Sequence, residues 1–291
     1  MKIDTVELHP DGSSNVCTLS FRDVSRENPY NVKGITGLDA DEITKMFYGT
    51  PGSQEFYNLM GKKKEIVALI ELNPRWELGE SPSSLRDDLY KMIASSRRGI
   101  IDIQFKLGDA ITASIQGSVA KFEASLFTPT PEVQMTIQCK KSFLEAPEPV
   151  SLDVIGLDPV LTVINDPLST APHGLKFELK VTAATASFSF TDPDDPTWFY
   201  TITPYGGFLV NDVIHFSSEW NDKYIYVVRG GTTIYLADTV QHGSVWPIMF
   251  PGETKLAISN GVNLDWNAIS YVPTYWGVEW IFSSSETQHT Q

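Results

Sequence analysis

Cysteine is scarce in this chain, and the spacings that hold metal ions are missing. The two cysteines, Cys17 and Cys139, stand far apart among 291 residues, with no Cys-x-x-Cys spacing. This excludes a disulfide framework and the common zinc sites, and it favours two buried free thiols over a disulfide. No histidine lies in a His-Glu-x-x-His or Cys/His spacing. The five histidines are His9, His173, His215, His242 and His289.

Long apolar runs and a secretory leader pattern are also lacking. No stretch of about 18 uncharged apolar residues occurs, and the N-terminus mixes acids among its apolar residues. This pattern is not that of a signal peptide. We therefore expect a soluble protein that is made in the cytoplasm and has no membrane partner.

Positive charge is sparse, and most of it lies in the first half. The chain has 22 Lys and Arg against 36 Asp and Glu, a net charge of −14. Residues 1–150 hold 17 of these cations and 21 of the acids, whereas the remainder holds 5 and 15. Such a surface repels polyanions, so we expect no sequence-specific nucleic-acid binding.

Patterns that carry catalysis are absent as well. The chain has no G-x-S-x-G nucleophile motif and no phosphate-binding glycine loop, and its 36 acids do not single out a glycosidase pair. Asp192, Asp194 and Asp195 could bind calcium, but the prolines between and after them favour a solvated turn. We expect no catalytic residue, no cofactor, no metal site and no enzymatic activity.

The first half mixes strands with helices. Alternation predicts strands at 16–22 and 30–35, and the capping-box spacing of Asp39 and Glu42 predicts a short helix at 40–47. Residues 62–72 predict a strand covered on both faces, with its three lysines at a solvated end. Ser81 and Pro82 begin a helix whose apolar stripe is Leu85, Leu89, Met92 and Ile93.

Four strands and then a change of pattern follow this helix. We predict strands at 100–107, 110–116, 118–127 and 133–139, packed with the helix as an α+β layer. Residues 143–149 contain two prolines and two acids and form the best linker candidate. Beyond them, short strands alternate with glycine and proline turns, as in a sandwich or jelly roll. The predicted domains are 1–145 and 146–291, in a mainly β chain with an α+β N-terminal part.

Tryptophan concentrates in the second half, where six of seven occur. Such rings stack on sugars, but they also fill sandwich cores, which we consider the better explanation. The segments 215–220 (HFSSEW) and 276–280 (WGVEW) partly match galectin sugar signatures, but Ser217, Glu219 and Trp280 replace the asparagine and the two arginines. The segment 246–252 (WPIMFPG) predicts a structural corner, with Trp246 and Phe250 as buried anchors.

An ordered set of segments in the first half resembles the distal tail proteins of long-tailed, non-contractile bacteriophages. No single segment is specific, but their order matches that family. The second half resembles the family less closely, at 207–213, 229–231 and 246–252. The segments of the first half are 30–42, 63–67, 72–76, 85–90 (LRDDLY), 117–123 and 127–139, which ends in PEVQMTIQC.

This resemblance implies a structural role in the virion. The resemblance implies that the N-terminal domains form a hexameric ring. This ring joins the tail tube to the tail tip or baseplate hub and lets DNA pass. A galectin-like β-sandwich projects outward. The expected partners are further copies of the chain, the tail-tube protein and the tip or baseplate hub protein, in a virion assembled in the host cytoplasm.

The alternative is a carbohydrate-binding module for host attachment, which would stack glycans on Trp220 or Trp276. The chain departs from the family at 39–48, which is longer and more helical, and in the polar tail 283–291, which we expect to be disordered.

Overall fold

The chain is mainly β and divides into two compact units, each built from separate segments of sequence. The first comprises Met1–Thr44, Met60–Pro147 and Tyr275–Gln291, and the second comprises Lys45–Leu59 and Glu148–Thr274. The predicted boundary at 145 lies close to Pro147, but the two predicted domains are not continuous in sequence. The computed structural model describes residues 2–20, 28–39, 43–48, 56–61, 64–96, 98–151, 161–166, 168–195, 197–219, 222–277 and 279–280.

Seven strands of the first unit close into a barrel. Their order is β10-β7-β4-β3-β2-β8-β9, and β9 pairs again with β10. Only the β3–β4 pair is parallel among these. Closure leaves the strands no free edges, so the predicted open α+β layer is instead a barrel with a helix beside it. The strands are β2 (Thr5–Pro10), β3 (Cys17–Ser20), β4 (Tyr30–Thr36), β7 (Glu65–Leu72), β8 (Ile101–Leu107), β9 (Ala110–Ser125) and β10 (Glu132–Cys139).

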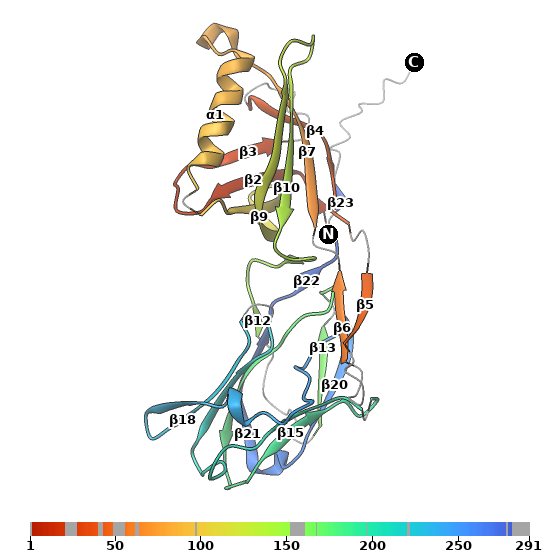
Figure 1. Ribbon diagram of the computed structural model, residues 1–291, viewed down its shortest axis with the longest axis vertical. Coiled ribbons are helices and arrows are strands. Elements are labelled where there is room, and N and C mark those ends of the chain that lie inside the picture. The colour runs from red at the N-terminus through yellow and green to blue at the C-terminus, as the bar shows by residue number, and fades with distance from the viewer. Residues whose placement is uncertain are drawn as a thin grey trace. The chain divides into compact units, whose positions relative to one another are not determined.

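The predicted helix is confirmed as α1 (Pro82–Ala94) (Figure 1), and its Tyr90 ring lies 4.2 Å from the ring of Phe122 on the long strand β9. Ser81 begins it: its side chain accepts from the Ser84 N–H at 3.1 Å, and the Ser84 hydroxyl accepts from the Ser81 N–H at 2.8 Å. These reciprocal bonds satisfy backbone donors that the first turn leaves free. Leu85, Leu89 and Met92 are buried, so the apolar stripe packs into the core of the first unit.

The predicted break between two strands at Gly117 is wrong. The segments 110–116 and 118–127 form one continuous strand, β9. Gly117 marks a close approach of strands: a Cβ there would lie 2.6 Å from Ile137 Cγ2 and 2.9 Å from the Gln138 carbonyl oxygen. Glycine therefore lets β9 and β10 come together where the barrel closes.

The helix predicted at 40–47 is also wrong. The structure has a strand, β5 (Ile43–Tyr48), paired with β6 (Phe56–Gly61) in a two-stranded sheet. This segment favours a strand over a helix, because it contains the β-branched Ile43 and Thr44 and the aromatic Phe47 and Tyr48. Residues 40–42, which contain the expected capping glutamate, lie outside the described residues.

Lys64, the last of the three lysines before β7, does not lie at a solvated strand end as predicted. Lys64 is buried, and its ammonium donates to the carbonyl oxygens of Leu38 and Asp39, both at 2.9 Å, and of Trp276 at 2.6 Å. Three N–H donors thus meet three carbonyl acceptors inside the first unit, which offsets the cost of burying the charge. Lys62 and Lys63 lie outside the described residues.

The second unit consists of two antiparallel sheets around one core. The six-stranded sheet has the order β12-β21-β14-β17-β18-β19, and the four-stranded sheet has the order β13-β20-β15-β16. Apolar side chains from both sheets share a single cluster. The strands are β12 (Val150–Ser151), β13 (Leu161–Asp166), β14 (Lys176–Val181), β15 (Phe188–Thr191), β16 (Phe199–Ile202), β17 (Val213–Ser217), β18 (Tyr224–Arg229), β19 (Thr232–Tyr235), β20 (Gly252–Ile258) and β21 (Leu264–Tyr271).

The predicted corner at 246–252 is confirmed for one of its two aromatics. The Trp246 ring lies 4.8 Å from the ring of Tyr200 and 5.3 Å from that of Phe216, against the core of the second unit. Gly252 begins β20 with φ at 86°, a conformation that favours glycine. Phe250 is exposed, so it is not the second anchor.

The remaining elements are short. β1 pairs in parallel with β23, and β11 pairs with β9. The tail 283–291 lies outside the described residues. These elements are β1 (Lys2–Ile3), β11 (Leu144–Glu145), β22 (Thr274–Tyr275), β23 (Glu279–Trp280), η1 (Trp76–Leu78), η2 (Ala237–Thr239) and η3 (Gly261–Asn263).

Candidate functional site

Polar clusters that could carry chemistry are few in the part of the chain that the structure describes. Within it, no group of three or more His, Cys, Asp or Glu side chains could hold a metal ion. In the loop after β15, the Asp192 carboxylate accepts from the Asp194 N–H at 2.8 Å, and the Asp195 carboxylate accepts from the Thr197 N–H at 3.1 Å. These carboxylates cap the turn that the prolines favour.

The two cysteines are free and buried, as the sequence predicts. Burial raises the pKa of the Cys17 thiol to about 12. Burial likewise raises the pKa of the Cys139 thiol to about 12. Since the thiolate is the reactive form, neither cysteine is a nucleophile at neutral pH.

A buried carboxylate, Asp166, organises one end of the second unit. Its Oδ1 accepts from the N–H groups of Leu168 and Ser169 and from the Tyr271 hydroxyl, each at 3.0 Å. Its Oδ2 lies 2.8 Å from His173 Nε2. Burial alone would raise the pKa of this carboxyl, but the donors from Ser169, Leu168 and Tyr271 outweigh it and hold the pKa below its usual value.

The same histidine has a second acceptor. His173 Nδ1 lies 2.8 Å from the Gly174 carbonyl oxygen, so its two ring nitrogens both face oxygen atoms. The Asp166 and His173 side chains are each 1% exposed. Because no substrate can reach this histidine–aspartate pair, its role is structural. The spacing of the two residues in the sequence did not indicate that they would pair.

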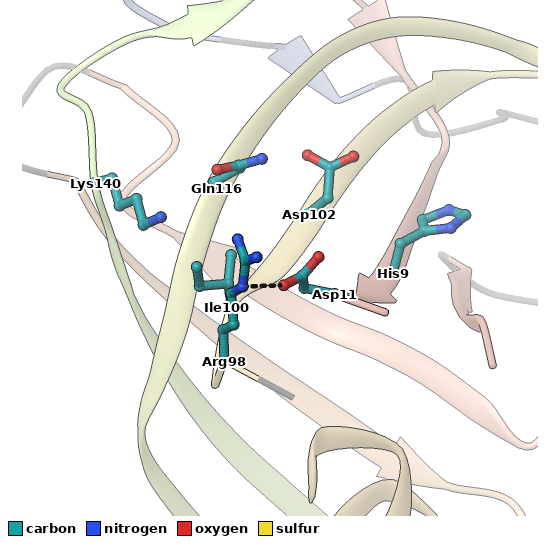
Figure 2. A pocket seen from close by; sticks show the side chains of 7 residues that line it. All are labelled: His9, Asp11, Arg98, Ile100, Asp102, Gln116 and Lys140. Atoms are coloured by element: carbon teal, nitrogen blue, oxygen red, sulfur yellow. Dashed lines mark ion pairs between the residues drawn. The ribbon is translucent and has the colours of Figure 1, made fainter. Parts of the chain in front are cut away.

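A small polar pocket opens on the barrel of the first unit (Figure 2). Its volume is about 180 Å³, below the usual range of ligand sites. Asp11 and Arg98 face each other across it at 3.6 Å, while Asp102 and Lys140 add one more charge of each sign (Figure 2). Because the charges balance, the pocket selects neither anions nor cations.

A second hollow of the first unit is a groove of about 470 Å³ at the end of the β9–β10 hairpin. Residues 71–77 and 128–131 line it, together with Leu126 and Pro82. Three large apolar side chains stand exposed at this end: Trp76 (68% exposed), Leu78 and Phe127. We call the groove and these three residues the hairpin groove. Exposed apolar surface of this kind marks protein–protein contact sites.

The loop that presents Trp76 and Leu78 is held in shape from within. Arg75 donates through Nε to both Glu80 carboxylate oxygens, at 3.0 and 3.1 Å, and the Arg75 N–H donates to Glu80 Oε2 at 2.9 Å. Gly79 closes the turn with φ at 74°. The hydrogen bonds from Arg75 lower the pKa of the Glu80 carboxyl. The apolar side chains are therefore preorganised for contact.

The tryptophans of the second half occupy different parts of the structure. Trp266 is buried in the core of the second unit, and Trp198 and Trp246 pack against it. Trp276 belongs to the first unit, where its carbonyl oxygen accepts from Lys64. Trp220 lies outside the described residues. The preference for core positions is thus confirmed for Trp198, Trp246 and Trp266.

No helix within the described ranges is long and apolar enough to cross a bilayer.

Comparisons with known proteins identify a fold and no sequence relative. No protein-family model matches the chain, and no curated protein matches it. Two structures of the phage p2 baseplate in its activated conformation, with Sr and with Ca, match at a TM-score of 0.39 and at 11% and 10% identity, covering 94% of this chain and 98% of theirs. That TM-score is too low to support an argument.

The crystal structure of the SPP1 Dit protein, described as a paradigm of the hub adsorption apparatus in phages that infect Gram-positive bacteria, matches far better. Its TM-score is 0.58 at 12% identity, and the match covers 92% of this chain and 98% of that chain. The resemblance to phage distal tail proteins that the sequence indicated is therefore confirmed at the level of the fold: this chain has the fold of the SPP1 Dit hub protein.

Proposed function

We propose that this protein is a structural hub of a bacteriophage tail. In this proposal its N-terminal unit forms a homohexameric ring, which joins the tail tube to the tail tip or baseplate and lets DNA pass. The second unit is a galectin-like β-sandwich that projects from the ring. The protein acts in the virion after assembly in the host cytoplasm, and it has no enzymatic activity.

The main support for this proposal is the similarity of the fold to that of the SPP1 Dit protein. The match extends through both units rather than one, since it covers 92% of this chain and 98% of the other. A shared β-barrel alone would be weak support, because barrels serve many functions. A match that extends over both units of this chain is a more specific likeness.

The hairpin groove provides one of the surfaces that a ring requires. A closed ring uses two different patches on each subunit, one binding the other on its neighbour. The groove is concave, is bordered by exposed Trp76, Leu78 and Phe127, and includes Pro74 and Pro129 in its wall. Rigid proline and preorganised aromatic surface lose little conformational entropy on binding. We propose that this groove contacts a neighbouring subunit or the tail protein next to the ring.

The charge of the first half suits a channel for DNA. Residues 1–150 carry slightly more acids than cations. A lining rich in Lys and Arg would bind phosphates through counterion release and hinder sliding. We therefore propose a neutral or acidic lumen, and a ring lined mostly by Lys and Arg would contradict it.

Two variants test the role of the groove. Phe127→Asp and Trp76→Ala should leave the melting temperature nearly unchanged, because both side chains are largely exposed. Each should reduce incorporation of the chain into assembled tails about tenfold or more, as expected when an interface anchor is lost. Quantitative immunoblots of purified particles would measure this.

The matched control is Val262→Asp, which changes an equally exposed apolar residue of the second unit. It should be incorporated as the wild type is. Normal incorporation of both groove variants would overturn the assignment of the groove but leave the hub proposal standing. Absence of the wild-type chain from tails would overturn the hub proposal itself.

A further inference from the structure

The six-stranded sheet of the second unit ends in a strand with one open edge. Among the described residues, β19 pairs with β18 and with no other strand. The two glycines of the connecting turn, Gly230 and Gly231, have φ values of 55° and 81°, which suit a tight two-residue hairpin. The hairpin that contains β18 projects from the side of the second unit (Figure 1). Its outer strand is therefore held in a fixed conformation.

The open edge carries backbone groups that lack partners. The Leu236 N–H donates to the Ile225 carbonyl oxygen at 3.0 Å, and residues that face the partner strand alternate with residues that face away. Ile234 and Leu236 therefore turn their backbone groups toward β18, whereas Thr233 and Tyr235 turn theirs away. No described residue bonds to the backbone of Thr233 or Tyr235. Two N–H groups and two carbonyl oxygens are thus available along β19.

An edge of the other sheet is covered by the chain itself. β16 is the last strand of the four-stranded sheet, and residues 239–241 pair with its open side. The Thr203 N–H donates to the Thr239 carbonyl oxygen at 3.1 Å, and the Gln241 N–H donates to the Thr201 carbonyl oxygen at 2.9 Å. No described segment covers β19 in this way. The second unit therefore closes an edge of one sheet and leaves an edge of the other open.

β19 lacks several features that protect such an edge. Charged residues, prolines and bulges discourage another strand from pairing. The sequence of β19 is Thr-Thr-Ile-Tyr, its register with β18 is regular, and all four residues are exposed. β-branched and aromatic residues of this kind favour strand pairing. Because β19 is short, the edge suits a short added strand.

The apolar face of the sheet is incomplete at this edge. Ile234 lies directly opposite Val227, which is 1% exposed in the core of the second unit. Directly paired residues share one face of a sheet, so Ile234 faces the core side as well, yet it is 38% exposed. A further strand with an apolar side chain beside Ile234 would cover it and extend the core.

Charge indicates which kind of strand the edge accepts. From Tyr224 to Phe250 the charged residues are Arg229 and Asp238. Arg229 Nη2 is paired with Asp212 Oδ2 at 2.7 Å. By contrast, no described residue bonds to the side chain of Asp238, which is exposed just after β19. A cation at this end of an added strand would be attracted to that carboxylate.

We propose that β19 accepts a short, extended and positively charged segment of another protein as an additional antiparallel strand. The main chain of that segment bonds to the outward backbone groups of Thr233 and Tyr235. An apolar side chain of the segment covers Ile234, and a Lys or Arg lies near Asp238. The edge belongs to the second unit, so the proposal does not depend on ring formation by the first unit.

A second copy of this chain is a less suitable occupant. Residues 151–291 carry 5 Lys and Arg against 15 Asp and Glu. Two second units that pair through β19 would therefore repel each other. A cationic segment from another protein meets attraction where a second copy meets repulsion.

The test is fluorescence anisotropy of the full chain with a labelled synthetic peptide, Lys-Arg-Thr-Val-Thr-Val-Thr. In antiparallel pairing, a valine lies beside Ile234 and the two cations lie toward Asp238. The peptide should bind with a dissociation constant of about 1 mM or below. N-methylation of its threonines blocks the amides that face β19 and should abolish binding. N-methylation of its valines alters the amides that face away and should leave binding unchanged.

Two variants of one residue separate the backbone from the side chain. Thr233→Pro removes the outward N–H and should weaken peptide binding about tenfold or more. Its melting temperature should stay near that of the wild type, because this N–H takes no part in the pairing with β18. Thr233→Ala keeps the N–H and should bind within about twofold of the wild type. Asp238→Asn should weaken binding about threefold at low salt and less at high salt.

Three results would overturn the proposal. One is a folded Thr233→Pro variant that binds the peptide as tightly as the wild type, and another is equal binding of the two N-methylated peptides. The third is no binding of the unmethylated peptide at about 1 mM. Dimers of the full chain that Thr233→Pro abolishes, detected by analytical ultracentrifugation, would assign the edge to a second copy and so overturn the proposal as well.

Discussion

At the scale of single residues, the most constrained groups are polar and buried. Asp166 accepts four hydrogen bonds in the interior of the second unit, and Lys64 donates three in the first. Both residues are polar, so the hydrophobic pattern of the sequence does not mark either of them as buried. Each is stabilised by partners that lie far away along the chain, such as Tyr271 for Asp166 and Trp276 for Lys64.

Asp166→Asn should lower the free energy of unfolding by about 3 kcal/mol at pH 7, because it leaves His173 without its anionic partner. The folded-state pKa of Asp166 is lowered, so its carboxylate stabilises the fold above the unfolded pKa of about 3.9. That contribution is lost as the pH falls through the folded pKa. The difference between wild type and variant should therefore shrink below about pH 4.

Urea denaturation between pH 3 and about pH 7 would measure this difference. Asp194→Asn is the matched control, since its carboxylate is exposed in the same unit and should change stability by less than about 0.5 kcal/mol. An Asp166→Asn variant as stable as the wild type at pH 7 would contradict this account of the network. A difference that widened in acid would contradict the assigned direction of the pKa.

At the scale of elements, the closure of the barrel depends on how near β9 and β10 approach each other. Gly117→Ala should destabilise the first unit by about 1–3 kcal/mol, because the added methyl meets Ile137 and the Gln138 carbonyl. Thermal unfolding would measure the loss. Ser118→Ala changes the next residue on the exposed side of β9 and should have little effect. Equal stability of the two variants would show that the strands are not tightly apposed at Gly117.

The same strands show what sequence could predict and what it could not. Periodicity located α1, because its apolar stripe faces the core, and it predicted the succession of short strands in the second unit. It failed at Gly117, where one strand was predicted to end and another to begin, although the glycine is explained by the close approach of a neighbouring strand. The helix predicted at 40–47 from the spacing of a capping box was also wrong. Local patterns do not reveal close approaches by distant parts of the chain.

The candidate sites were harder to foresee than the fold. The hairpin groove combines residues from 71–77 with others from 126–131, which only the fold brings together. The sequence directed attention to tryptophans instead, and most of those described serve the core.

At the scale of the whole molecule, each unit has its own core. The first unit has a closed barrel with the hairpin groove, and the second has two sheets. A hub needs binding surfaces rather than a reaction centre. Weak ring contacts can depend on neighbouring proteins, so a monomer in dilute solution is compatible with a ring in the tail.

The most direct test of the hub proposal is cryo-electron microscopy of phage particles whose copy of this chain carries a small C-terminal tag. The account predicts tag density arranged with sixfold symmetry around the end of the tail tube, with the barrel units forming a ring around the channel. Tag density on the capsid, or particles that lack the chain altogether, would contradict it.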